Sequence, residues 1–216
     1  MPTATVLNPA GRPDRMTVWS RAAPLRRVVR VSTEISDLLD AAAPAVTAVV
    51  QSVRDDQLDE RTPCTEFTVR DLLNHLLQVA QNFQALAHSK EVDWAPGPDR
   101  LTGDWRAEFT GDVRTLGEVW SDPATLDGTS PGLGLPQRVV GMMLVVHAWD
   151  LAIATGQPYT VEPVLLSATG EFLDIMGDTG RQMGAFGPEV TAPDDSDAFA
   201  VLLARTGRDP RWQPAN

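Results

Sequence analysis

The chain of 216 residues is 43% hydrophobic, which suffices for one well-packed core without disulfides or a membrane. Its net charge of −11 would repel nucleic-acid phosphates and anionic lipid, so the composition argues against both kinds of partner. Cys64 is the only cysteine, which excludes an internal disulfide and a zinc site built mainly of thiolates. No stretch reaches the roughly 18 apolar residues of a membrane-spanning helix, and we expect a protein of the cytoplasm.

The N-terminal segment differs in composition from the rest of the chain. Its first 30 residues contain six arginines and one acid, a balance of +5 that leaves −16 for the other 186 residues. Four prolines and no helical or strand period accompany this charge. We therefore predict that residues 1–31 are a disordered basic arm or a non-native extension, and that residues 32–214 form the folded domain.

From Ser32 onward the hydrophobic pattern is helical. Apolar residues at three- and four-residue spacing predict a helix over residues 33–54, with a face made of Ile35, Leu38, Leu39, Ala42, Val46, Val49 and Val50. Thr68 and Asp71 have the spacing of a capping box and predict a second helix over residues 68–89. A third amphipathic stripe predicts a helix over residues 104–120.

The fourth predicted helix, over residues 137–155, is almost entirely apolar and should be central in the fold. Its polar exceptions are His147 and Asp150, and Gly156 is expected to end it. Two further helices are predicted over residues 162–176 and 196–205. The expected class is all-α, a four-helix bundle with short C-terminal helical additions.

Two of the chain's three histidines lie in its most apolar predicted helices. His75 belongs to the stripe of the second helix, and His147 belongs to the fourth. A histidine in such a position is either a hydrogen-bonded core residue or part of a metal site, and the residues alone leave both interpretations open. His88 lies in a polar context near the end of the second helix and is predicted to be on the surface.

Three separated motifs carry a resemblance to a known family. In order, they are TPCTEFTVRDLLNHLL, VVHAWDLAIATGQP and LLARTGRDPRW. They resemble the DinB-like, metal-binding proteins related to mycothiol-dependent maleylpyruvate isomerase, over about residues 33–214. The resemblance implies a DinB/YfiT-like four-helix bundle with a divalent metal, usually zinc, between its helices. It also implies mycothiol as the thiol cofactor of a cis-to-trans isomerisation.

The resemblance implies His75 and His147 as metal ligands. The isomerase pattern places a carboxylate four residues before the second histidine, one helical turn away, and this chain has Met143 there. A thioether is a poor ligand for such a cation, so the usual ligand set is incomplete. Asp150 is the candidate substitute. It could ligate the metal directly or orient the ring of His147, and we favour the second role.

Two classes of function follow. The first is a divalent-metal-binding, thiol-dependent enzyme of the maleylpyruvate isomerase or thiol-transferase type, with a small molecule or thiol as its partner. The alternative is a non-catalytic or degenerate bundle that binds a small ligand or a protein partner without metal, and a regulatory module is a variant of it. Cys64 is expected to be a packed thiol ahead of a helix rather than a nucleophile.

Overall fold

The computed structural model describes residues 34–131, 133–141, 147–182 and 184–214. Across these ranges the regular structure consists of helices, and the only strand-like features are two isolated β-bridges. The predicted all-α class is therefore confirmed. The predicted N-terminal arm, residues 1–31, and Met143 lie outside the described residues.

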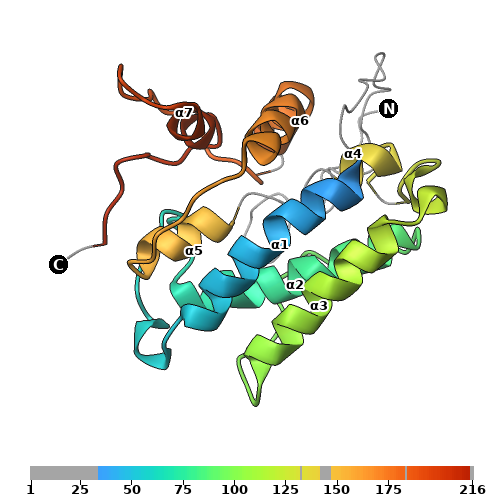
Figure 1. Cartoon of the computed structure of the whole chain (residues 1–216), viewed down its shortest axis with the longest axis horizontal. Coiled ribbons are helices and arrows are strands. Elements are labelled where there is room, and N and C mark those ends of the chain that lie inside the picture. Colours follow the sequence, from blue (N-terminus) through green and yellow to red (C-terminus); the bar gives the residue numbers. More distant parts are fainter. Residues whose placement is uncertain (1–33, 132, 142–146, 183, 215–216) are drawn as a thin grey trace, which may run out of the picture.

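Three long helices form the body of the bundle. They are α1 (Ile35–Ser52), α2 (Val69–Ala87) and α3 (Trp105–Trp120), each close to the range expected from its apolar stripe. Helix α3 packs against both α1 and α2 (Figure 1). These contacts bury one face of each helix, and each large apolar side chain taken from water contributes about 1.5–3 kcal/mol.

The remaining helices cover the other side of α1 and α2. Helices α4 (Gln137–Gly141) and α5 (Ala148–Ala154) both contact α2, and α5 also contacts α1. Helix α6 (Pro163–Gln182) packs against α1, and α7 (Ala198–Arg205) packs against α6, which places the C-terminal helices on the outside of the bundle (Figure 1). Two short 3-10 helices, Asp55–Gln57 and Pro123–Leu126, lie in the connections.

The start of α2 follows from its local sequence. The Thr68 hydroxyl accepts the backbone N–H of Asp71 at 3.2 Å, and the Asp71 carboxylate accepts the backbone N–H of Thr68 at 3.0 Å. This reciprocal capping box satisfies donors that the first turn of a helix leaves without partners. The predicted capping box is thus present, and it sets where α2 begins, roughly two turns before His75.

The fourth predicted helix is described in two parts. Helix α4 begins at Gln137 and α5 ends before Gly156, which has φ +68° and closes the helix as expected, while residues 142–146 lie outside the described ones. His147 was expected within a helix, but it is the residue that precedes α5, with φ −94° and ψ −8°. Its side chain makes no capping bond to the backbone, because the ring turns toward Asp150 instead.

Helix α6 is longer than the predicted 162–176 and continues to Gln182. Gly180 lies within it because the ring of Phe186 packs where a side chain at that position would be. Glycine often ends a helix, but Gly180 lies inside α6 and makes room for the Phe186 ring.

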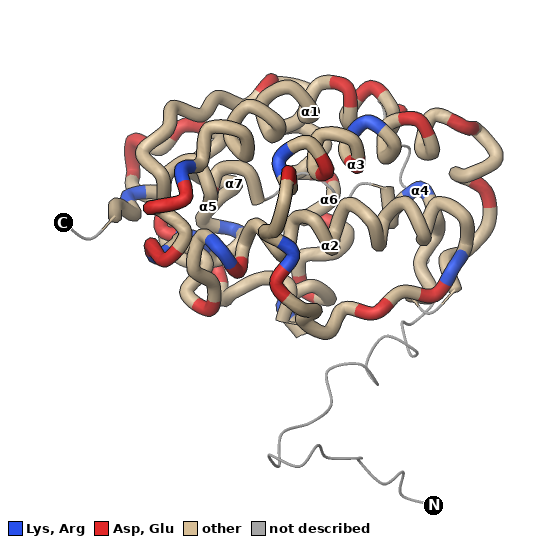
Figure 2. The backbone as a smooth tube through the Cα atoms, turned by 90° about the horizontal axis from the view of Figure 1, so that it is seen from below, with Lys and Arg blue, Asp and Glu red and all other residues tan. Residues whose placement is uncertain are grey.

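Seen from below, acidic residues are distributed around the described body rather than gathered on one face (Figure 2). In the described part of the chain, no helix combines the length and the hydrophobicity that crossing a bilayer requires.

Candidate metal centre

Two imidazole rings from different elements meet inside the bundle. His75 lies on α2 and His147 directly before α5, and their ring centroids are 5.0 Å apart with an interplanar angle of 85°. Both residues are half-buried. Two imidazoles bound to one tetrahedral zinc ion through Zn–N bonds of about 2.0–2.1 Å hold their ring centroids roughly 5 Å apart. The observed separation therefore fits a shared cation.

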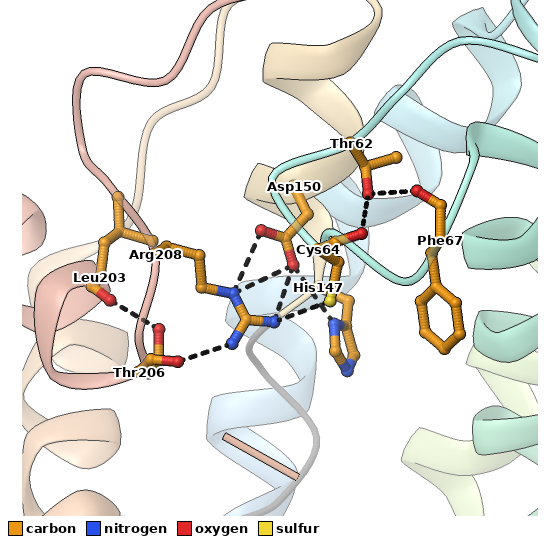
Figure 3. Close-up of polar contacts among 8 residues, drawn as sticks. All are labelled: Thr62, Cys64, Phe67, His147, Asp150, Leu203, Thr206 and Arg208. Carbon is orange, nitrogen blue, oxygen red and sulfur yellow. Dashed lines mark hydrogen bonds and ion pairs between the residues drawn. The ribbon is translucent and has the colours of Figure 1, made fainter. Parts of the chain in front are cut away.

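Asp150 holds the ring of His147. Its side chain is fully buried in the first turn of α5, and its Oδ2 lies 3.4 Å from His147 Nδ1 (Figure 3). Because a carboxylate only accepts hydrogen bonds, this contact assigns the proton of the neutral ring to Nδ1. The other nitrogen, Nε2, keeps its lone pair. A carboxylate behind the ring in this way orients a metal-binding histidine.

Arg208 neutralises the buried charge of Asp150. Its Nη2 lies 2.9 Å from Oδ2, and its Nε lies 3.2 Å and 3.3 Å from Oδ1 and Oδ2 (Figure 3). Its Nη1 donates to the backbone oxygen of Thr206 at 3.0 Å. The Arg208 side chain is 5% exposed and that of Asp150 0%. Both carboxylate oxygens are thus committed within the protein, which supports the orienting role over direct ligation.

The turn after α7 delivers Arg208 to this position. Gly207 follows the helix with φ +84°, and a Cβ built on it would lie 2.7 Å from the Cα of Gly187. Only glycine meets both the positive φ and the close backbone approach at this point. The C-terminal segment can therefore turn back toward α5, where Arg208 meets Asp150, a residue 58 positions earlier in the chain.

Cys64 also contacts the guanidinium of Arg208. Its Sγ is 3.5 Å from Arg208 Nη2, and the residue is half-buried in the turn that precedes α2. The Thr62 hydroxyl lies 3.0 Å from the carbonyl oxygen of Cys64 and 2.8 Å from that of Phe67, which closes the turn (Figure 3). The Phe67 ring in turn packs against His75 at 5.3 Å between centroids. Cys64 and His75 therefore belong to one locally ordered segment.

Burial and neighbouring charge shift several pKa values in the site. Burial, together with the nearby His147, lowers the pKa of His75 to about 3, so this ring is neutral near pH 7. Burial raises the pKa of the Cys64 thiol, with Arg208 opposing the shift. Burial alone would also raise the pKa of Asp150, but the hydrogen bond to His147 and the charge of Arg208 outweigh it and the pKa is lowered.

The structure brings His75, His147 and Asp150 together, although they come from two segments about seventy residues apart. His88 is exposed at the end of α2, as predicted, and takes no part. Sequence reasoning gave Arg208 no role and treated Cys64 as a packed thiol. Arg208 lies in the closing motif and Cys64 in the TPC motif, which marked both as candidates. No local sequence pattern, however, relates either residue to His147, which is far away along the chain.

One group of candidate ligand atoms lies close together in the described residues, and it does not include His75. Cys64 Sγ, one ring nitrogen of His147 and one carboxylate oxygen of Asp150 lie within 4.8 Å of one another. In the part of the chain that the structure describes, this is the one group of three or more His, Cys, Asp or Glu ligand atoms so close together. Neutral imidazole and thiolate suit zinc, whereas Mg²⁺ and Ca²⁺ prefer oxygen ligands.

A cavity of about 740 Å³ opens elsewhere in the bundle, between α1, α2 and α3. Its walls are mainly apolar and include Leu76, Phe109 and Val113, but neither His75 nor His147. It is large enough for a small ligand and is separate from the histidine pair.

The chain is similar to one known protein family and to two proteins of Mycobacterium tuberculosis. A family model described as the mycothiol maleylpyruvate isomerase N-terminal domain matches residues 39–152. Two proteins of Mycobacterium tuberculosis, both named only as uncharacterized, are 30% identical over an alignment of 178 residues that covers 77% of this chain and 95% of theirs. No solved structure matches. The matched residues include α2, His147 and Asp150, while Arg208 lies beyond them.

Proposed function

Because the chain belongs to the mycothiol maleylpyruvate isomerase N-terminal domain family, we propose that it is a divalent-metal-binding, thiol-dependent enzyme of the isomerase or thiol-transferase type. The metal is zinc or a similar borderline cation, and His75 and His147 are its ligands. Mycothiol is the proposed thiol, since the family is defined by it. The single observation that carries the proposal is the 5.0 Å approach of the two imidazoles, with Asp150 oriented behind one of them.

The side chains of the site have separable roles. His75 offers a neutral ring, because burial lowers its pKa to about 3, and Asp150 accepts from Nδ1 of His147, which leaves Nε2 of that ring on the side away from the carboxylate. Arg208 keeps Asp150 ionised and in place. When bound, a divalent cation supplies Lewis acidity that lowers the pKa of a coordinated thiol or water, so that the anion exists near pH 7. A thiol that must add to a double bond requires that activation.

Metal analysis of protein purified without a histidine tag tests the proposal. We expect about one equivalent of zinc in the wild-type chain and its loss in His75→Ala and His147→Ala. His88→Ala is the matched control, because it removes the third histidine from an exposed position and should leave the metal content unchanged. Equal metal content in all four proteins, or none in the wild type after incubation with zinc, contradicts the proposal.

Activity tests the thiol part separately. The metal-loaded protein is assayed with mycothiol and maleylpyruvate for isomerisation, and with other electrophiles for thiol transfer. We expect turnover that requires both the metal and mycothiol. If the protein binds zinc but forms no product with any thiol, the proposed metal site stands and the proposed enzymatic activity is refuted.

The cavity between α1, α2 and α3 favours one alternative, a bundle that binds a small ligand without metal. Phe109→Ala would then weaken ligand binding, while His75→Ala would not. The two proposals therefore differ in which of these substitutions matters.

A further inference from the structure

The cavity between α1, α2 and α3 owes its space to small residues on facing helices. Ala43 and Ala48 of α1 and Gly117 of α3 line it, and larger side chains at these positions would occupy that space. Buried apolar side chains, among them Leu76 and Phe109, form its walls. Its volume of about 740 Å³ lies within the range of about 300–1,000 Å³ that small-molecule sites have. The cavity can therefore take up the apolar part of a ligand.

Two contacts between α1 and α3 mark the ends of the cavity. At one end, Gln51 Nε2 donates to Thr110 Oγ1 at 3.1 Å. At the other, a Cβ built on Gly117 would lie 3.8 Å from Asp40 Oδ1. All four residues line the cavity. The two helices thus run antiparallel, and the end of the cavity at Asp40 lies beside the last turn of α3.

The Asp40 end of the cavity is rich in negative charge and hydrogen-bond acceptors. Glu118 lies in the last turn of α3, where the backbone carbonyls make the helix end electronegative and no basic residue compensates. Pro44, inside α1, has no N–H, so the carbonyl oxygen of Asp40 lacks its usual helical donor. Asp40 and Glu118 are exposed, and in the described part of the chain neither belongs to an ion pair.

Arg114 is the cationic side chain that lines the same cavity. It is exposed and lies one turn before Glu118 on α3, but it pairs with neither carboxylate in the described structure. Two carboxylates and one guanidinium leave the rim with a net charge of −1. The rim therefore favours a cation over an anion, while the apolar walls favour hydrocarbon.

We propose that this cavity binds an apolar molecule that carries a cationic amino group. The hydrocarbon part lies between the helices, against Leu76 and Phe109, and the ammonium group lies at the Asp40 end, where it donates to carboxylate and carbonyl oxygens. Neither His75 nor His147 lines the cavity, so the site acts with or without a metal on the histidines. The inference thus goes beyond the proposed function and does not depend on it.

Isothermal titration calorimetry with three matched probes tests the inference. The probes 4-phenylbutylamine, 4-phenylbutanol and 4-phenylbutyrate share one hydrocarbon part and differ in charge. They are titrated into the full-length chain in the presence of a chelator, so that a metal on the histidines does not contribute. We expect the amine to bind at least about threefold more tightly than the alcohol, and the carboxylate to bind most weakly. High salt should reduce the difference.

Substitutions at the rim separate the effect of charge from that of the hydrocarbon contacts. Asp40→Asn and Glu118→Gln should each weaken binding of the amine about two- to fivefold and leave the alcohol unchanged, whereas Arg114→Gln should strengthen binding of the amine. Asp37→Asn is the matched control, because Asp37 is an exposed carboxylate of α1 that does not line the cavity. Ala43→Phe should abolish binding of all three probes, because the new ring occupies the space.

The outcomes are distinct from those of the metal analysis. Equal affinity for the three probes, or equal effects of Asp40→Asn and Asp37→Asn, overturns the proposed charge preference. Unchanged binding in a folded Ala43→Phe variant shows that the probes bind elsewhere, which overturns the site. If that variant does not fold, the exposed substitutions at the rim decide. A chain that sediments as a dimer and takes up none of the probes assigns the cavity to a second copy and also overturns the inference. Each of these results leaves the proposed zinc site standing.

Discussion

Replacing Arg208 by methionine should destabilise the protein far more than its position near the C-terminus suggests. Asp150 and Arg208 are 0% and 5% exposed, so solvent does not screen their interaction. Methionine keeps much of the side-chain volume but removes three contacts at 2.9–3.3 Å and leaves the Asp150 carboxylate with His147 as its partner. Removing one member of a buried ion pair typically costs about 3–5 kcal/mol.

Chemical unfolding followed by circular dichroism measures this cost. The experiment is performed with a chelator, so that metal binding does not contribute to the free energy of unfolding. For a domain of this size, about 3–5 kcal/mol corresponds to a fall in Tm of roughly 10 °C. The double variant Asp150→Asn/Arg208→Met should lose less than the sum of the two single variants, because it leaves no unpaired buried charge.

Arg205→Met is the matched control. Arg205 belongs to the same C-terminal segment and lies 2.6 Å from Asp174, but that carboxylate is 71% exposed. An exposed pair contributes under about 1 kcal/mol. If Arg205→Met and Arg208→Met lower the free energy of unfolding equally, the buried pair does not anchor the C-terminal segment and the argument is refuted.

Two further predictions concern pH and backbone strain. Since the pKa of His75 falls from 6.5 in the unfolded chain to about 3 in the fold, the unfolded state binds its proton first on acidification. The free energy of unfolding of the metal-free protein should therefore fall between pH 6.5 and pH 3, by up to about 1.4 kcal/mol per pH unit from this group. Urea titrations at several pH values measure this, and in His75→Gln the free energy should depend less steeply on pH. An equal dependence on pH in the two proteins would count against a buried neutral ring. Gly207→Ala should cost about 2–3 kcal/mol in the same assay, because the new Cβ combines φ +84° with a collision against Gly187. Gly134→Ala is the control, at φ +64° with nothing within 4 Å of the new Cβ, and should cost about 1 kcal/mol. Equal losses in the two variants would show that the collision is relieved without cost.

Helix positions could be predicted wherever the cause was local. The capping box joins Thr68 to Asp71, three residues on, and the apolar stripe of α1 repeats every three or four residues; both are present as expected. The extension of α6 to Gln182 was not predicted, and within it Gly180 leaves room for the ring of Phe186, a residue that lies beyond the helix.

For the candidate site, the sequence by itself determined which residues are candidate ligands. A chain with three histidines, two of them in apolar helical segments, restricts the ligands to few candidates, and an aspartate three residues after His147 must lie near that ring. Tertiary structure alone decided how they are used. It brings Arg208 to Asp150 across 58 residues and to Cys64 across 144, and no local pattern records contacts at such separations. Because Arg208 contacts both oxygens of Asp150, that carboxylate is held inside the protein beside the ring of His147, and the same Nη2 of Arg208 also reaches Cys64.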